Sequence, residues 1–466
     1  MAWRYVLVCI ALLLTGCATT GDWSSDGSTG QSRKDPRAAK APRINLNKQS
    51  VSSLEAPSNN LWLRIRDGFQ MPELDSPLVI EQVRWLSARP DYVHRSMARS
   101  SRYLFYIVQE VNSRGMPTEL ALLPFVESAF NPQAKSGARA MGIWQFMPAT
   151  GKDFRLTQNV FRDERRDVLQ STDAALDYLQ RLYNQFGDWQ LALAAYNWGS
   201  GNVSKAQKRN LAAGLPIDYI SLNMPNETRN YVPKLMAYRQ IVLDPDSYGI
   251  VLPELENHPY FVAVDVTKDI DVSLAAKLAD MSMEEFQNLN PSFNKPVILS
   301  AANQQILLPF GHAEVFQENL GNYAKPLSSW TAVVINKTVT PEQAAQSLGV
   351  DLATLKDVNG IPKGMRIRAG STILIPRVGH GPGDISVSMA ENASLSLEKP
   401  PPPPKKGTKK GKNSKDAREG VAKDPKSPPS QHKSASTELA KSAKNDTVKA
   451  TSKSVKVIIG KGAAKI

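Results

Sequence analysis

The sequence predicts a mainly α-helical domain, followed by two small α+β units and a basic tail without a folded core. Apolar residues recur at helical spacing between residues 60 and 245. An imperfect repeat with an offset of 69 residues lies between residues 260 and 376, which marks a duplicated unit. No Phe, Tyr or Trp occurs from Arg377 onward. Because a chain of 466 residues rarely builds a single core, we expect several domains.

The N-terminus is typical of a secretory targeting segment. Arg4 precedes an apolar run, Val6 to Leu14, that is shorter than the roughly 20 residues of a membrane-spanning helix. Residues 1–16 are therefore expected to be a removed signal peptide. The tetrapeptide LTGC that ends at Cys17 resembles the lipobox of bacterial lipoproteins, which implies a lipid on the Cys17 thiol and attachment to a membrane. An ordinary signal peptide with an incidental cysteine is the alternative.

The cysteines and histidines limit the chemistry. Only Cys9 and Cys17 are present, which excludes a disulfide scaffold, a zinc ribbon and a CxxC redox site. The five His are far apart and form no HExxH motif, so we expect no metal and no cofactor. Loss of Cys9 with the signal peptide suits an oxidising periplasm. Ala18 favours the outer membrane, because an Asp at that position would resemble an inner-membrane retention signal.

The segment after the signal peptide divides into a tether and a helical domain. Residues 17–59 are rich in Ser, Thr, Gly, Lys and Asn, which predicts a flexible tether. Residues 60–245 are expected to form a compact α-domain with a motif core at 100–240. The apolar positions that recur at helical spacing are Leu104, Ile107, Val108 and Val111, and again Ala175, Tyr178, Leu179 and Leu182.

The repeat predicts two units of the order strand, helix, helix, strand, at residues 260–310 and 329–377. Within these units, residues Ala275 to Asn290 align with Ala344 to Asn359. Each copy closes with an apolar tetrapeptide that ends in proline. The units resemble degenerate LysM modules, which bind glycans that contain N-acetylglucosamine, and the second copy is the clearer one. A structural spacer is the alternative.

Residues 378–466 are expected to be a disordered basic tail. Lys, Ser, Pro and Ala dominate it, and such a segment buries too little apolar surface to offset its conformational entropy. From Pro401 to Ile466 there are 17 Lys and Arg against 5 Asp and Glu, a net of +12 out of +13 for the whole chain. The folded part is thus close to neutral, and we expect no nucleic-acid partner.

Glu127 is the candidate catalytic residue. It follows seven residues, Leu120 to Val126, that are all apolar or proline. Burial among such residues penalises the ionised carboxyl and predicts a raised pKa. A carboxylic acid that stays protonated near neutral pH can donate a proton to a glycosidic oxygen. A solvent-exposed glutamate at a helix end is the alternative.

Three further segments carry residues suited to a polysaccharide site. Residues 137–148 combine glycines, an amide and aromatic side chains, which offer flat apolar faces to sugar rings. Residues 194–201 and 227–233 place polar and aromatic side chains at helix ends. Each segment alone is more often a helix cap or part of a core. Their joint order and spacing is the specific signal.

Together the motifs resemble catalytic domains of the soluble-lytic-transglycosylase type. The matching motifs are Glu127-Ser128, Gly142-Ile-Trp-Gln145, Ala195-Tyr196-Asn197 and Asn230-Tyr231. With its flanking helices the resemblance covers about residues 60–245, and it implies a lysozyme-like fold of the goose-lysozyme type with Glu127 as the single acid and base. The positions that it implies on the substrate side, or in support of the glutamate, are Ser128, Gln145, Phe146, Met147, Tyr196, Asn197 and Tyr231.

The number of carboxylates favours bond cleavage without water. Hydrolysis usually needs two carboxyls, and Glu227 is the only other acidic residue in the segments that carry the matched motifs, 137–148, 194–201 and 227–233. A lone glutamate can protonate the bond oxygen and then accept the proton of the substrate's C6 hydroxyl, which closes onto C1 as 1,6-anhydro-N-acetylmuramic acid. The resemblance implies that peptidoglycan strands are the substrate, and we expect a monomeric enzyme. A hydrolytic muramidase and a non-catalytic peptidoglycan-binding lipoprotein are the alternatives.

Overall fold

The computed structural model describes residues 59–301, 305–377 and 383–400. The predicted signal peptide, the predicted lipidation site at Cys17 and residues 401–466 of the tail lie outside these ranges. None of the helices in the described ranges combines the length and the apolar character needed to cross a membrane.

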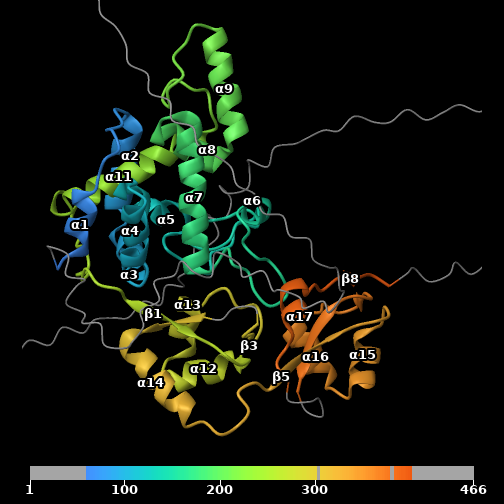
Figure 1. Cartoon of the computed structure of the whole chain (residues 1–466). Helices are drawn as coiled ribbons and strands as arrows, with labels where there is room; N and C mark the ends of the chain where they lie inside the picture. Colours follow the sequence, from blue (N-terminus) through green and yellow to red (C-terminus); the bar gives the residue numbers. More distant parts are fainter. Residues whose placement is uncertain (1–58, 302–304, 378–382, 401–466) are drawn as a thin grey trace, which may run out of the picture. The chain divides into compact units, whose positions relative to one another are not determined.

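The first domain is helical, as predicted (Figure 1). Helix α8 packs against both α7 and α9, and α11 lies along α2. The elements in chain order are α1 (Leu61–Asp67), α2 (Pro77–Ser87), α3 (Pro90–Ser100), α4 (Leu104–Ser113), the 3₁₀ helix η3 (Thr118–Leu122), α5 (Leu123–Ser128), α6 (Pro148–Asp153), α7 (Val168–Phe186), α8 (Trp189–Trp198), α9 (Ser200–Ala212), α10 (Asn226–Arg229), α11 (Tyr231–Leu243) and the 3₁₀ helix η4 (Asp246–Tyr248).

The predicted helical spacing is confirmed in α4 and α7. All four apolar positions of α4 are fully buried, which places one face of this helix in the core. Helix α7 begins at Asp167, whose carboxylate accepts from the backbone N–H groups of Leu169 and Gln170. It ends at Gly187, which adopts a φ of 66° that favours glycine. These local signals fix the long helix behind the candidate site.

The repeat forms two units with the predicted order of strands and helices, here called module 1 and module 2. In both modules the first strand pairs antiparallel with the strand that ends in proline. Module 1 contains β1 (Phe261–Asp265), β2 (Ile270–Asp271), α12 (Val272–Leu278), α13 (Met283–Leu289), β3 (Val297–Ile298), β4 (Gln305–Pro309) and α14 (Phe310–Gly321). Module 2 contains β5 (Trp330–Val334), α15 (Pro341–Leu348), α16 (Leu352–Asn359), β6 (Arg366–Ile367) and β7 (Thr372–Pro376).

Equivalent asparagines at the end of the second helix show that the modules are true repeats. The Asn290 side chain donates to the carbonyl of Leu307 at 2.9 Å and accepts from its N–H at 2.8 Å. Asn359 makes the same pair of bonds to Leu374, at 2.8 Å each. Each buried amide thereby joins its helix to the closing strand and satisfies backbone groups that water cannot reach.

Module 1 extends beyond its predicted end at residue 310. Helix α14 follows β4 directly and packs on the module core through Ala313 and Phe316, each 1% exposed. The sequence prediction placed the end of the module directly after the proline of the closing strand, Pro309. The extra helix covers apolar surface that would otherwise face water.

The prediction of disorder from residue 378 is wrong for residues 383–400. This segment contains helix α17 (Val387–Asn392) and strand β8 (Leu397–Glu398). Leu397 pairs opposite Ile367 of β6, so β8 adds a strand to module 2. Ile385 and Ala390 are buried. The absence of aromatic residues was misleading, because aliphatic side chains alone supply enough apolar surface for a short segment that packs on an existing core.

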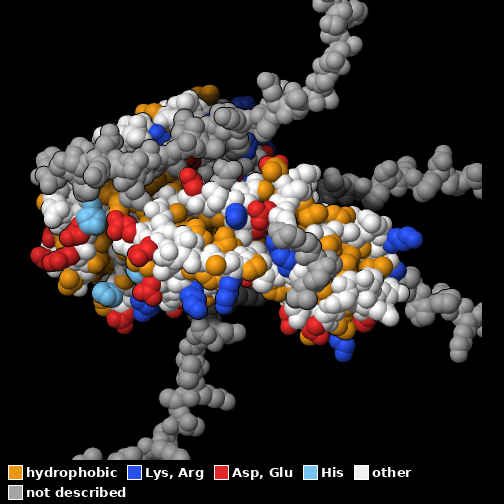
Figure 2. Space-filling view, turned by 60° about the horizontal axis from the view of Figure 1, so that its bottom comes forward, with side chains coloured by type: hydrophobic (Ala, Val, Ile, Leu, Met, Phe, Trp, Pro, Cys, Tyr) orange, Lys and Arg blue, Asp and Glu red, His pale blue; other side chains and the backbone are white. Residues whose placement is uncertain are grey.

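The described surface carries charges of both signs. Figure 2 shows Lys, Arg, Asp and Glu side chains across the face that is turned forward. This agrees with the near balance of charge that the sequence gives for residues before 401.

Candidate active site

Glu127 lies in the last turn of α5, directly before a sharp reversal of the backbone. Ala129 and Phe130 adopt the left-handed region, with φ of 50° and 56°, which residues other than glycine rarely do. Their N–H groups donate to carbonyls of α5. The rings of Phe125 and Phe130 are buried and meet edge to face, with centroids 4.5 Å apart. Packing thus holds a strained turn that sets the direction of the glutamate.

The Glu127 carboxyl is half-buried, and its pKa is raised to about 7. The main cause is loss of water around the charged form, as the apolar segment before Glu127 predicted. The hydroxyl of Tyr231 donates a hydrogen bond to Oε1 and lowers this pKa. The negative charge of Glu227 raises the pKa, and the positive charge of Lys234 lowers it. A substantial fraction of the carboxyl therefore carries a proton at neutral pH.

Tyr231 is the residue that holds the carboxyl. It begins α11 and is only 3% exposed. Burial raises its pKa well above the ordinary value, and the charge of Glu127 raises it further. The phenol therefore keeps its proton near neutral pH and acts as a donor. The hydrogen bond of Tyr231 therefore positions the Glu127 carboxyl.

Three predicted site residues hold the loop of residues 137–147, here called the Gly142 loop, beside α5. The hydroxyl of Ser128 donates to the carbonyl of Ile143 at 3.0 Å. The hydroxyl of Tyr196, in α8, donates to the carbonyl of Trp144 at 2.9 Å. Gln145 has a φ of 50°, and its side-chain amide donates back to the carbonyl of Gly142 at 2.8 Å. The loop is thus tied to α5 and α8, two of the helices that carry the matched motifs.

Gly142 serves the packing of this loop and not the close approach of a ligand. Its φ is 79°, and a Cβ there would lie 2.2 Å from the carbonyl oxygen of Arg165. Arg165 is itself buried, pairs with Asp163 at 2.7 Å and donates to the carbonyls of Arg139 and Phe146. Sequence reasoning missed this arginine. Its signal is an acid two residues away, because a buried arginine needs a partner.

The aromatic residues of the Gly142 loop belong to the core, which corrects two expectations. Trp144 is 0% exposed, and its indole N–H donates to the hydroxyl of Thr172 at 3.0 Å. Phe146, expected on the substrate side, is 2% exposed and packs behind the loop near Tyr196. A side chain in a tight loop with few polar neighbours is buried where space allows. Met147, in contrast, is 43% exposed and is available to a ligand.

Asn197 is oriented by a residue that sequence reasoning missed. The buried Thr228 donates from its hydroxyl to Oδ1 of Asn197 at 2.8 Å. Its carbonyl accepts from the hydroxyl of Tyr219 at 2.7 Å. The amide of Asn197 is therefore fixed so that Nδ2 is the group offered to a ligand. Thr228 lies inside the polar cluster of residues 227–233, but nothing in the sequence pairs it with Asn197.

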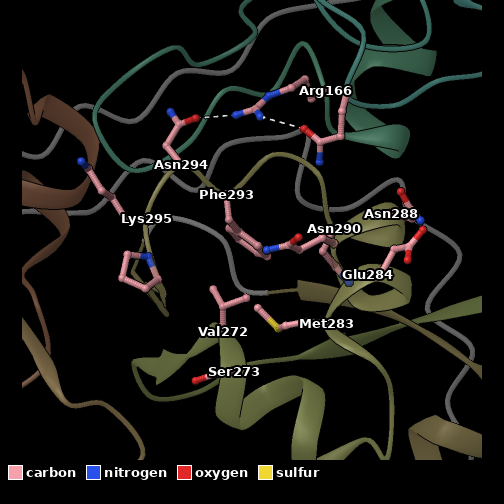
Figure 3. A pocket seen from close by; sticks show the side chains of 13 residues that line it. Arg166, Val272, Ser273, Met283, Glu284, Asn288, Asn290, Phe293, Asn294 and Lys295 are labelled. Carbon is pink, nitrogen blue, oxygen red and sulfur yellow. Dashed lines mark hydrogen bonds between the residues drawn. The ribbon is translucent and has the colours of Figure 1, made fainter. Parts of the chain in front are cut away.

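A pocket of about 590 Å³ is lined mainly by residues of module 1, together with Gln133 and Arg166 of the helical domain, and Glu127 is not among its lining residues. Figure 3 shows Arg166 donating to Asn294 and the ring of Phe293 pointing into the pocket. Arg166 also donates to Oε1 of Gln133 at 3.2 Å. Several of its lining side chains are amides, among them Gln133, Gln287, Asn288 and Asn294. None of the predicted site residues lines it. Glu127, and not this pocket, is therefore the candidate centre of the chemistry.

Comparison with known proteins follows the division seen in the structure. The family profile described as the Transglycosylase SLT domain matches residues 106–214. The membrane-bound lytic murein transglycosylase D of Escherichia coli is 33% identical over 395 residues, which cover 82% of this chain and 86% of that protein. The chain belongs to this family. The soluble lytic murein transglycosylase of Escherichia coli is 34% identical over 118 residues, 24% of this chain and 18% of that protein.

Family membership confirms the fold predicted for both parts of the chain. The first domain is a mainly helical, lysozyme-like SLT domain, and the matched residues include Glu127, Gln145 and Asn197. The profile described as the LysM-like domain of the lytic transglycosylase MltD matches residues 260–325. That range includes α14, in agreement with the longer module 1 seen in the structure.

Proposed function

We propose that this chain is a peptidoglycan lytic transglycosylase with Glu127 as its single acid and base. It cleaves the β-1,4 bond between N-acetylmuramic acid and N-acetylglucosamine. The observation that supports this best is a half-buried carboxyl with a pKa of about 7, held by a buried tyrosine, in a chain related to murein transglycosylases. Such an acid is protonated often enough to protonate a leaving oxygen near neutral pH.

The reaction needs one carboxyl and no water. Protonated Glu127 gives its proton to the glycosidic oxygen as the bond from that oxygen to C1 of N-acetylmuramic acid breaks. The C6 hydroxyl of the same sugar attacks C1, forms the new C1–O6 bond and gives its proton to the Glu127 carboxylate. The enzyme ends in its starting protonation state, and the products are a free 4-hydroxyl and a 1,6-anhydro end. The nucleophile belongs to the substrate, so its effective concentration is high.

The other site residues position the Glu127 carboxyl and the Gly142 loop or bind the substrate. Tyr231 orients the Glu127 carboxyl, and Ser128 fixes the Gly142 loop beside it. Gln145, Met147, Tyr196 and Asn197 are half-buried or exposed and are assigned to substrate contact. No cofactor enters this scheme.

The decisive experiment combines two glutamine variants with product analysis. Glu127→Gln should lower release of muropeptides from isolated sacculi by about a thousandfold or more, because general acid and base catalysis are both lost. The matched control is Glu227→Gln, a nearby exposed carboxylate, which should keep activity within about tenfold. Mass spectrometry should find anhydro ends. Reducing ends would establish the hydrolase, and full activity of Glu127→Gln would remove this residue from the mechanism.

We propose that in the cell this chain is a lipoprotein, anchored through a lipid on Cys17 at the periplasmic face of the cell envelope. The outer membrane is the favoured membrane. The lipobox-like sequence supports this, and the name of the related Escherichia coli protein describes it as membrane-bound. Cys17→Ala should abolish fatty-acid labelling and leave unprocessed precursor. Label retained on this variant would place the lipid elsewhere.

Module 1 is proposed to hold glycan strands at the pocket of Figure 3. Its amide side chains and the ring of Phe293 offer the mixture of hydrogen bonds and apolar contact that sugars use. Phe293→Ala combined with Gln287→Ala should weaken binding of the Glu127→Gln chain to sacculi several-fold. Glu314→Ala, on α14 outside the pocket, is the control. Equal binding of both variants would favour a structural spacer.

A further inference from the structure

The segment that follows α9 presents apolar side chains to solvent. Residues 211–218 are all exposed, and the only charged one among them is Asp218. Exposed fractions reach 70% for Leu211, 54% for Leu215, 43% for Ile217 and 55% for Ile220. Four large aliphatic side chains within ten residues form a patch of the kind that marks an interaction surface. We call residues 211–220 the tip, and Figure 1 shows α9 leading away from α8 toward it.

The tip is a built structure and not a loose loop. The side chain of Asn210, 6% exposed, donates to the carbonyls of Pro216 at 2.7 Å and Ser221 at 2.9 Å. The backbone carbonyl of Asn210 accepts from the backbone N–H of Leu215 at 2.9 Å. Tyr219 points inward and is buried. One buried amide thus closes the turn and holds the aliphatic side chains outward, so little entropy is lost when they are covered.

Basic residues adjoin the aliphatic ones. Lys205, Lys208 and Arg209 are all exposed on the last two turns of α9, at spacings that bring them to one side of the helix. Asp218 is the one acid on the tip, so this part of the domain is net positive. Aliphatic side chains beside Lys and Arg are the composition of segments that lie in the interface of an anionic bilayer.

We propose that the tip inserts into the headgroup layer of an anionic phospholipid membrane and docks the catalytic domain on it. The aliphatic side chains enter the boundary between headgroups and acyl chains, while the three basic residues face lipid phosphates. A sugar ring would stack on an aromatic face, and the exposed part of the tip offers none.

The proposed anchor keeps such a membrane within reach, although tip docking does not depend on the catalytic role of Glu127. About 40 residues separate Cys17 from the first described residue, Asn59, and a chain of that length spans at most about 140 Å. Because the tether holds the domain near the bilayer, a weak contact at the tip is enough to orient it.

The test is sedimentation of the mature chain, residues 17–466, with vesicles that contain phosphatidylglycerol. Cys17→Ser removes the lipid. The triple variant Leu215→Asn, Ile217→Asn, Ile220→Asn is compared with a control in which two exposed aliphatic residues elsewhere, Ile80 and Val251, become asparagine. The tail carries most of the chain's net charge. Any binding that rests on this charge is removed at about 0.5 M salt, where the Debye length is only a few ångströms.

At high salt the triple variant should bind at least about tenfold more weakly than the control, because burial of each aliphatic side chain contributes an amount that salt does not screen. At low salt, Lys205→Gln with Lys208→Gln should weaken binding to anionic vesicles and leave binding to neutral phosphatidylcholine vesicles unchanged.

Glu127→Gln should bind vesicles normally, which separates this proposal from the catalytic one. Equal binding of the triple variant and the control would overturn it. The proposal would also be overturned if the triple variant bound vesicles normally but lost cell-wall turnover in cells, since that result points to a protein partner.

Discussion

Replacing Glu127 with glutamine is expected to stabilise the folded chain at neutral pH while it abolishes catalysis. Burial raises the carboxyl pKa from about 4.5 to about 7. Below pH 4.5 the folded and unfolded chains both hold the proton, so there is no penalty. Between these values the unfolded chain releases the proton and the folded chain keeps it, and stability falls as pH rises. Above pH 7 the penalty is constant, at about 3 kcal/mol.

Glutamine keeps the acceptor for Tyr231 but has no charge to bury, so the variant escapes this penalty. Its stability advantage should be near zero at pH 4 and grow to about 3 kcal/mol at pH 8. For a domain of this size that corresponds to a rise in melting temperature of roughly 6–12 °C at pH 8. Thermal unfolding of the full chain, followed by intrinsic fluorescence between pH 4 and 8, measures it.

The control is Glu81→Gln, which removes an exposed carboxylate of α2. It should follow the wild-type chain at every pH to within about 2 °C. A Glu127→Gln variant whose advantage is the same at pH 4 and pH 8 would refute the reasoning, because the penalty would then not arise from ionisation.

Three further predictions concern the support of the site. Tyr231→Phe removes a hydrogen bond that lowers the pKa of Glu127, so the alkaline limb of the pH–rate profile should move to higher pH while kcat falls. Thr228→Val should lower kcat/KM about tenfold with a similar melting temperature, and Thr228→Ser should restore it. Gly142→Ala should cost at least about 1–3 kcal/mol of unfolding free energy, since it forces a left-handed backbone and a clash with a carbonyl. Gly137→Ala, with open space around it, should be nearly neutral in the same denaturant titration.

The sequence by itself determined the elements whose signals are local. Periodic apolar residues and a capping aspartate specified α4 and α7, because a helix is fixed by neighbours three and four positions apart. The repeat specified two modules, since the same pattern of apolar and turn residues builds the same unit twice. The apolar run before Glu127 gave the direction of its pKa shift, because desolvation depends on the kind of residue nearby.

Only the tertiary structure decided which side chains meet across long separations. The sequence carries no record that Thr228 faces Asn197, that Arg165 fills the space beside Gly142, or that Phe146 turns inward. It also misjudged residues 383–400, whose few aliphatic side chains are too sparse to fold alone but whose strand β8 pairs with β6, which module 2 already provides. Such contacts depend on the shape and register of whole elements, and their free energy is gained only once those elements are in place.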